Sequence, residues 1–440
     1  MGSPSARSEN RHPSVSSMIG LDGLTFCITD IANGLGAFTA TYLQADRHWD
    51  PAKVGAAISA AGIAAVIVQT PAGALIDYVR QKRKIIILGC LAVAVCALAI
   101  TLTKSFAATV AYEAVIGAVT TFLPPAIAAI SLGLVGHAGL DRRVGRNQAF
   151  SHGGNVMAAA LAGWLGFAVS QAWVFYLIAI LNLLTVGFVL MIRKDEIDFD
   201  ISRGGDGKNE ETGDRSFGAV WHARVGDFTE AFKDSRTLIF VLALFLFHFA
   251  NAGVLPLVGQ HFGLSSTKQS ALYMGAAIII AQLVMIPTCW ACGKWVKRFG
   301  RKPLFLIAFA CVPIRAALCA VDGNPVYLVA IQSLDGISAG VFYVLSVLVV
   351  ADLTRGTKRF NAIQGFAATC WSLGAALSPY IAGVIAKSHF KTAFLFLAVV
   401  GVGATVFFWI FMPETRKEEG EEGEKGKEGK EGKKPEGQAA

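Results

Sequence analysis

The chain has 440 residues, of which 54% are hydrophobic and only 16% are charged, and its mean hydropathy is +0.53. An average soluble protein carries about 25% charged residues, so this chain lacks the polar surface that a water-soluble globule needs. A soluble enzyme, a secreted disulfide scaffold and a disordered chain are therefore excluded. The net charge of +8 does not indicate nucleic-acid binding, because the basic residues form short clusters between apolar runs.

Apolar runs long enough to cross a bilayer recur along the whole chain. A membrane-crossing helix needs about 20 apolar residues, and lipid forces each span to satisfy its own backbone hydrogen bonds, which favours α-helices. The runs predict twelve spans, at 23–43, 54–76, 85–103, 107–135, 148–170, 172–192, 237–258, 270–292, 303–320, 326–350, 362–386 and 392–411.

Polar segments divide the spans into two groups of six. Residues 1–20 are Ser-rich and predict a disordered cytoplasmic N-terminus, followed by an N-terminal six-helix bundle at 21–192. Residues 193–236 predict a cytoplasmic linker, which is mobile in its Asp/Glu/Gly-rich first part and an amphipathic helix in its second. A C-terminal six-helix bundle at 237–412 and a disordered charged tail at 413–440 complete the expected domains.

Lysine and arginine are distributed unevenly between the loops on the two sides of the spans. The loops at 80–84, 142–146, 294–302 and 355–359 contain fifteen of them, and the loops on the opposite side contain six. Short loops rich in these residues stay in the cytoplasm. The sequence therefore predicts a multi-pass protein, placed in the plasma membrane, with both termini cytoplasmic.

The two groups of six spans resemble each other at a nearly constant offset. Asn33 corresponds to Asn251 at 218 positions, and Asn147 corresponds to Asn361 at 214. Parallel repeats of this kind place a binding site at the midplane between the halves.

A pattern of glycine and charge follows span two and is repeated after span eight. Its residues are Gly73, Asp77, Arg80, Lys82 and Arg83 in the first copy, and Gly293, Arg298, Gly300, Arg301 and Lys302 in the second. The pattern resembles the loop 2–3 signature of the major facilitator superfamily, although Arg80 replaces its second glycine and Lys297 replaces the acid of the second copy. The resemblance implies an all-α membrane fold of twelve helices in two pseudo-symmetric bundles.

These loop residues are expected to form a conformational latch. A carboxylate at a helix end beside basic residues can hold neighbouring helix ends together in one state and release them in another. The basic residues alone are also explained by topology, whereas Asp77 is not.

Ionisable residues inside spans are costly and usually face a cavity or a partner. Asp30 and His248 occupy matched positions, each three residues before Asn33 and Asn251, and together they predict a site for proton exchange and substrate binding. A structural hydrogen bond is the alternative for His248.

Three further ionisable residues belong to this candidate substrate and proton pathway. Arg315 and Asp335 lie at similar depth in successive spans, which favours an ion pair over a cation that binds an anionic substrate. Glu113 lies near the outer end of span four, where it could also reach interfacial water.

The resulting functional hypothesis is a secondary active transporter that moves a small organic solute by alternating access. Proton coupling is expected, and export of a metabolite or toxic compound is favoured over the alternatives, a nutrient uptake permease or a non-transporting membrane sensor. No catalytic, cofactor or metal-binding motif occurs in the sequence, so an enzyme is not expected. The expected partners are the small-molecule substrate, protons and the lipid bilayer, without nucleic acid, and the protein is expected to be a monomer.

Overall fold

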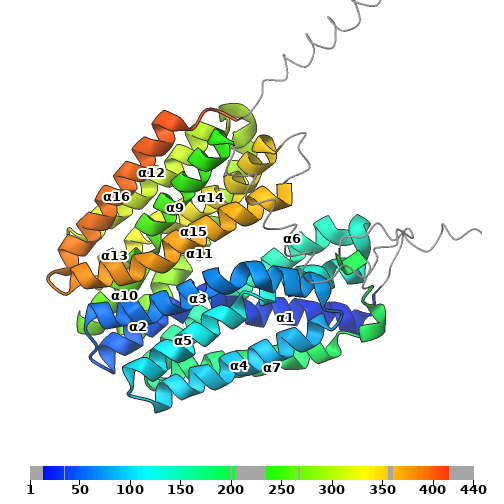
Figure 1. The fold of residues 1–440 in the computed structure, drawn as a ribbon. Helices are drawn as coiled ribbons and strands as arrows, with labels where there is room; N and C mark the ends of the chain where they lie inside the picture. The colour runs from blue at the N-terminus through cyan, green and yellow to red at the C-terminus, as the bar shows by residue number, and fades with distance from the viewer. Residues whose placement is uncertain are drawn as a thin grey trace, which may run out of the picture.

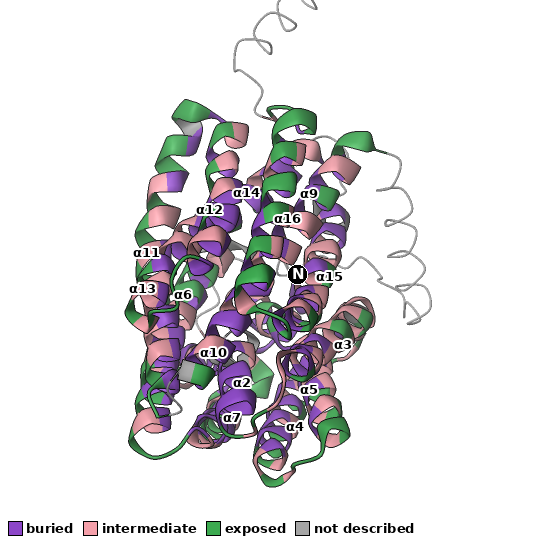
Figure 2. Cartoon of the chain, turned by 90° about the vertical axis from the view of Figure 1, so that its left-hand side faces the viewer, coloured by how far each residue is buried: buried purple, intermediate pink, exposed green. Residues whose placement is uncertain are grey.

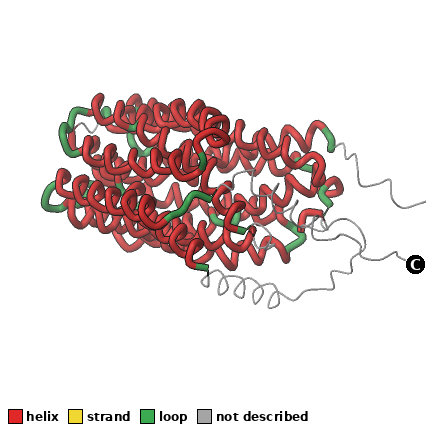
Figure 3. The backbone as a smooth tube through the Cα atoms, turned by 90° about the horizontal axis from the view of Figure 1, so that it is seen from above, coloured by secondary structure: helices red, strands yellow, loops and turns green. Residues whose placement is uncertain are grey.

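The computed structural model describes residues 13–33, 35–198, 201–203, 234–265, 268–354 and 360–415. Within these ranges the chain is almost entirely α-helical and contains no strand, as Figure 3 shows. The predicted all-α membrane fold is confirmed.

Seven of the described helices form the N-terminal half. They are α1 (Val15–Asn33), α2 (Leu35–Ala45), α3 (Pro51–Tyr78), α4 (Lys82–Leu102), α5 (Phe106–Thr120), α6 (Leu123–Ala168) and α7 (Trp173–Met191). Predicted span one corresponds to α1 and α2 together. Spans four and five share α6, whose helical course is broken at Gly136, where φ is +69°. A positive φ favours glycine, so this residue allows the chain to turn between the two spans.

Eight of the described helices form the C-terminal half. They are α9 (Ser235–Ala252), α10 (Val254–Ser265), α11 (Ser270–Phe299), α12 (Arg301–Cys319), α13 (Pro325–Ile331), α14 (Ser333–Leu353), α15 (Phe360–Ala386) and α16 (Phe390–Phe411). Span seven is divided into α9 and α10, and span ten into α13 and α14. Among the described residues, ten helical segments are long and apolar enough to cross a membrane.

The outward faces of the helices are apolar and exposed. Leu88, Val95 and Leu102 on α4 are 65%, 65% and 84% exposed, and α16 exposes Val399 and Trp409. Figure 2 shows exposed residues along the outer side of α16 and buried residues on the helices between it and the interior. A water-soluble surface would not expose such contiguous apolar side chains, so these faces are suited to lipid.

The structure corrects the predicted disorder of the N-terminus for residues 13–20, and residues 1–12 lie outside the described part of the chain. Helix α1 begins at Val15, and the backbone N–H and the hydroxyl of Ser14 both donate to the Glu196 carboxylate at 3.0 Å. Ser17 accepts a hydrogen bond from the Arg193 N–H at 2.9 Å. Serine composition indicated disorder, but these serines bind the chain that follows α7.

The first part of the predicted linker is also packed where the structure describes it. Residues 194–203 include the two 3-10 turns η2 (Lys194–Glu196) and η3 (Ile201–Arg203). Ile197 and Ile201 are buried, and the Asp198 N–H donates to the Gly133 carbonyl of α6 at 3.1 Å. The prediction that this stretch is mobile is therefore wrong for these residues, because Ile197 and Ile201 are buried against the rest of the half. The predicted amphipathic helix lies almost wholly outside the described residues.

Buried apolar side chains form two clusters, of which one includes residues of both halves and the other lies within the C-terminal half. The first includes most of the N-terminal half and continues into the C-terminal half through residues such as Val254, Phe262, Met274, Ala382 and Phe394. The second lies within the C-terminal half and is rich in phenylalanine, with Phe240, Phe305, Phe309, Phe342 and Phe408 among its members.

Among the described residues, the first cluster joins the halves at one end. Its C-terminal members lie at the end away from the lysine- and arginine-rich loops, which we call the opposite end, and the end that carries those loops is the basic end. Figure 1 shows the halves side by side where α2 and α10 lie and separated where α6 and α14 lie. The fold therefore holds the halves together at the opposite end.

Candidate functional site

Three polar side chains meet inside the C-terminal half. Arg315 on α12 forms an ion pair with Asp335 on α14 and donates to Asn251 Oδ1 on α9 at 2.9 Å. Asn251 in turn donates to Asp335 Oδ1 at 3.3 Å. The predicted ion pair is confirmed, and the Arg315 side chain is only 1% exposed. The buried and paired guanidinium is therefore not the exposed cation that binding an anionic substrate would require.

His248 on α9 lies among aromatic side chains. Its ring stacks on Trp371 of α15 at 5.8 Å between centroids and meets the edge of Phe342 at 4.6 Å. Its Nδ1 contacts the Leu244 carbonyl at 3.2 Å, which is the structural hydrogen bond that the sequence left open as an alternative. Tyr343, next to Phe342, is 57% exposed although it lies in the middle of a predicted span.

The matched residues in the N-terminal half are only partly described. Asp30 and Asn33 lie on α1, but their side chains are outside the described part of the chain, so the expected Asp30–His248 exchange stays a prediction. Glu113 on α5 is 2% exposed and accepts a hydrogen bond from the Thr39 hydroxyl of α2 at 3.3 Å. Glu113 therefore does not reach interfacial water, contrary to one expectation from the sequence.

Helices α3 and α15 bring the two halves into backbone contact at the opposite end. A Cβ atom added to Gly55 would lie 2.2 Å from the Pro379 carbonyl oxygen, and one added to Gly383 would lie 2.3 Å from the Pro51 carbonyl oxygen. The Tyr380 N–H donates to the Ser59 hydroxyl at 3.0 Å. Glycine at these two positions permits the close approach of the two helices.

An ion pair adds to this contact. Lys387, after α15, lies 3.4 Å from Asp50, which also caps the N-terminus of α3 through the N–H groups of Ala52 and Lys53. Partial burial acts to raise the pKa of the Asp50 carboxyl, but the hydrogen bonds from the Lys53 backbone and from Lys387 outweigh it and lower this pKa. The carboxylate is thus held charged between the two halves.

Two further helix pairs close the same end. A Cβ atom on Gly275 of α11 would lie 2.5 Å from the Ala159 carbonyl of α6, and one on Gly259 of α10 would lie 2.8 Å from the Thr41 hydroxyl of α2. His152 of α6 also contacts Gln282 of α11 through Nδ1 at 3.2 Å. These described contacts between the halves extend from the opposite end to mid-depth.

The first copy of the predicted latch lies at the basic end. Lys82 is 2% exposed, and its amine donates to the Ser202 hydroxyl at 3.2 Å. Arg83 donates to the Val189 carbonyl at 3.1 Å and so satisfies the C-terminus of α7. Gly73 and Asp77 lie on α3, but the Asp77 side chain is outside the described residues, and Arg80 is exposed. The role of Asp77 stays a prediction.

The second copy of the predicted latch binds Glu414, which lies just after α16. Gly300, at φ +86°, separates α11 from α12, and Glu414 accepts hydrogen bonds from the N–H groups of Arg301 and Lys302, each at 2.9 Å. Arg301 also donates to Asp352 at 3.0 Å. Sequence reasoning missed Glu414 and extended the disordered tail over it. Gly293 has open space around it, and Arg298 stacks over Phe299.

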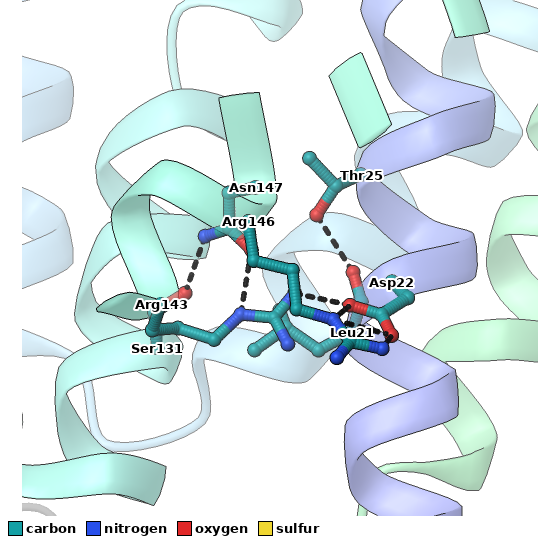
Figure 4. Close-up of polar contacts among 7 residues, drawn as sticks. All are labelled: Leu21, Asp22, Thr25, Ser131, Arg143, Arg146 and Asn147. Carbon is teal, nitrogen blue, oxygen red and sulfur yellow. Dashed lines mark hydrogen bonds and ion pairs between the residues drawn. The ribbon is translucent and has the colours of Figure 1, made fainter. Parts of the chain in front are cut away.

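Asp22 is the centre of a polar cluster that the sequence did not predict. Its carboxylate accepts hydrogen bonds from Arg143 at 2.6 Å and from Arg146 at 2.5 Å, as Figure 4 shows. Arg143 also donates to Asn147, which donates to Ser131 at 3.0 Å. The cluster joins α1 to both parts of α6. The helical spacing of the basic residues was visible in the sequence, but their acidic partner is 121 positions away from Arg143.

Comparison with known proteins identifies the family and the fold. The family model described as Major Facilitator Superfamily matches residues 23–314 and 290–436. An uncharacterized MFS-type transporter of Mycobacterium tuberculosis is 37% identical over 396 residues, which are 90% of this chain and 93% of the relative. Multidrug resistance protein 1 of Bacillus subtilis is 29% identical over 178 residues, 40% of this chain and 44% of the relative.

Solved structures share the fold at low sequence identity. The nucleoside transporter NupG is 18% identical, with a TM-score of 0.72 over 90% of this chain and 98% of its own. A D-xylose-proton symporter is 16% identical, with a TM-score of 0.63 over 91% of this chain and 98% of its own. The likeness extends through both halves.

Proposed function

The chain belongs to the major facilitator superfamily and is a multi-pass membrane transporter, and we propose that it moves a small organic solute by alternating access. The observation that carries this proposal is that, among the described residues, the buried cluster shared by the halves lies at the opposite end, while the ribbons of α6 and α14 lie apart at the basic end (Figure 1). We place the basic end in the cytoplasm from the charge of its loops, and the state seen here would then be the one open to the inside. The solute would then bind between the halves and be exposed to each side in turn.

The residues near the middle of the C-terminal half support a moderately apolar solute. His248, Trp371 and Tyr343 offer aromatic surface, with Phe342 buried behind them, and Arg315 already neutralises Asp335. Such a surface stacks on rings and offers few hydrogen bonds, which suits a planar or partly apolar compound better than a free ion.

We favour export over uptake. Among the partial relatives are a protein named for multidrug resistance and others named as efflux pumps, whereas the solved structures of the same fold include a nucleoside transporter and a sugar–proton symporter. Untargeted metabolite profiling decides between the two. Cells that lack the protein should accumulate an exported compound inside, and they should deplete a nutrient from the medium more slowly if the protein is an uptake permease.

Proton coupling is the second part of the proposal, and Asp30 is its first test. Asp30→Asn should abolish gradient-driven flux of the identified solute in proteoliposomes, because an amide cannot carry a proton. Asn33→Ala is the control and should alter mainly the affinity. A wild-type flux that does not change when the pH gradient is imposed would contradict proton coupling.

The proposed orientation places both termini in the cytoplasm of a plasma-membrane protein that works as a monomer. A tag inserted in the loop at 46–50 should be labelled from outside intact cells, and a tag at the C-terminus should be labelled only after permeabilisation. In intact cells, the tag at the C-terminus should not be labelled at all. Labelling of both tags from one side would overturn the orientation.

A further inference from the structure

Each half contains a carboxylate inside a predicted span, and the two carboxylates differ in their partners. An offset of 219 positions superposes the first residue of α5, Phe106, on the first residue of α13, Pro325, and it also superposes Cys96 on Arg315. With the same offset Glu113 falls on Gln332, one helical turn before Asp335. In the C-terminal half, the carboxylate Asp335 is therefore paired with Arg315. In the N-terminal half, the carboxylate is Glu113, and the thiol of Cys96 occupies the position that corresponds to Arg315.

Glu113 is correspondingly without an ion pair among the described side chains. It is 2% exposed, and the Thr39 hydroxyl, itself fully buried, is its hydrogen-bond donor. Asp335, in contrast, is bound by both Arg315 and Asn251.

The ionisable groups on the helices around Glu113 lie at the helix ends or are neutral. Lys53, at the start of α3, is turned to Asp50 at 3.8 Å, and Arg47, after α2, donates to Tyr42 and to the Thr101 carbonyl. The other such groups on α2 to α5 are the phenols of Tyr42, Tyr78 and Tyr112, the thiols of Cys90 and Cys96, Asp77 at the far end of α3, and Lys82, Arg83 and Lys84 at the basic end of α4. None of the described cations among them forms an ion pair with Glu113.

An isolated carboxylate charge is too costly to keep in such surroundings, since burying an unpaired charge costs far more than burying the neutral acid. We propose that Glu113, with Thr39, is a proton-binding site of the transport cycle. In the state in which its surroundings are hydrated, the carboxylate takes one proton from a hydronium ion and a water molecule is left behind. It holds that proton as a carboxyl group in the state seen here.

The consequence for transport rests on the proposed function. Because α2, which carries Thr39, also packs against α10 of the other half, protonation of Glu113 would be linked to closure of the opposite end. Release of the proton would then accompany a rearrangement of α2 and α5, which couples the proton to alternating access.

Infrared difference spectroscopy of the purified full-length protein, in a detergent without ester groups, tests the proton directly. The wild type at neutral pH should show the C=O stretch of a protonated carboxyl group that shifts in D₂O. Glu113→Gln should remove that band completely or remove one component of it. Glu196→Gln is the matched control and should leave it unchanged, because hydrogen bonds from Ser17 and Ser14 lower the pKa of the Glu196 carboxyl and keep it a carboxylate at neutral pH.

Two further variants keep the test decisive if Glu113→Gln does not fold. Thr39→Val preserves the side-chain shape and should shift the band without removing it, since only the hydrogen bond is lost. Cys96→Arg introduces the cation that the C-terminal half has, and it should convert the carboxyl band to a carboxylate band. Spectra of Thr39→Val and Cys96→Arg that superpose on the wild type would overturn the proposal.

Flux measurements separate this site from the proposed function. If the wild type responds to a pH gradient, Glu113→Gln should lose that response, and a response that survives would overturn the coupling role. If the wild type itself ignores the gradient, proton coupling fails as a function. In that case the carboxyl band of the infrared spectrum would still decide whether Glu113 carries a proton.

Discussion

Asp22→Asn should lower the free energy of unfolding by about 3–5 kcal/mol, because it leaves a buried arginine without its counterion. The Arg143 side chain is 1% exposed and Asp22 is 8% exposed, so water cannot replace the lost carboxylate. The same substitution also releases Arg146 and removes the charged link between α1 and α6. We expect a lower thermal midpoint in detergent, measured by the loss of the monomer peak on size-exclusion chromatography after heating.

Arg146→Gln provides the matched control for this prediction. It breaks an ion pair to the same carboxylate, but the Arg146 side chain is 53% exposed and is already solvated. Exposed pairs contribute little to stability, so this variant should resemble the wild type. In addition, Asp22→Leu with Arg143→Met should recover part of the loss, because it removes both charges together. Equal midpoints for Asp22→Asn and Arg146→Gln would contradict the importance of burial.

Gly55→Ala should shift the protein out of the state in which the opposite end is closed. The new Cβ atom would meet the Pro379 carbonyl oxygen at 2.2 Å, and backbone on both sides prevents an easy adjustment. Overpacking of this kind costs about 1–3 kcal/mol. Because about 1.4 kcal/mol changes an equilibrium tenfold, we expect a population shift of roughly tenfold and a comparable fall in transport rate.

Spin labels at Lys104 and Val321 measure this shift, since both positions are exposed loop residues at the opposite end, one in each half. Gly55→Ala should lengthen the distance between the labels. Gly187→Ala on α7 is the control, because nothing lies within 4 Å of the Cβ position there. An unchanged distance distribution in Gly55→Ala, beside an unchanged Gly187→Ala, would show that the α3–α15 contact does not set the conformational equilibrium.

Local pattern was enough to predict the membrane class, the helices and one ion pair. Lipid makes an apolar run of about 20 residues into a helix regardless of its partners, so span positions depend on nearby residues alone. Arg315 and Asp335 were paired correctly because they lie on consecutive spans, whose antiparallel course places residues at known depths. The loop signature and the repeat offset likewise are sequence features, and they led to the family that the comparisons show.

The remaining features depend on contacts between distant parts of the chain. The partners of Asp22 come from α6, the partner of Glu113 comes from α2, and Glu414 binds the start of α12. Ser14 and Ser17, at the start of α1, are held by hydrogen bonds with Glu196 and Arg193 after α7, and Ile197 is buried beside Gly133 of α6.

The sequence by itself therefore determined that this protein crosses the membrane in two related bundles and which side chains are costly to place there. Only the tertiary structure decided which of those side chains are paired, and that the halves meet at the end away from the basic loops. The physical reason is that bilayer insertion acts on each segment separately. Charge pairing and glycine-mediated contact instead require two segments at one place, and their approach is set by the packing of the whole fold.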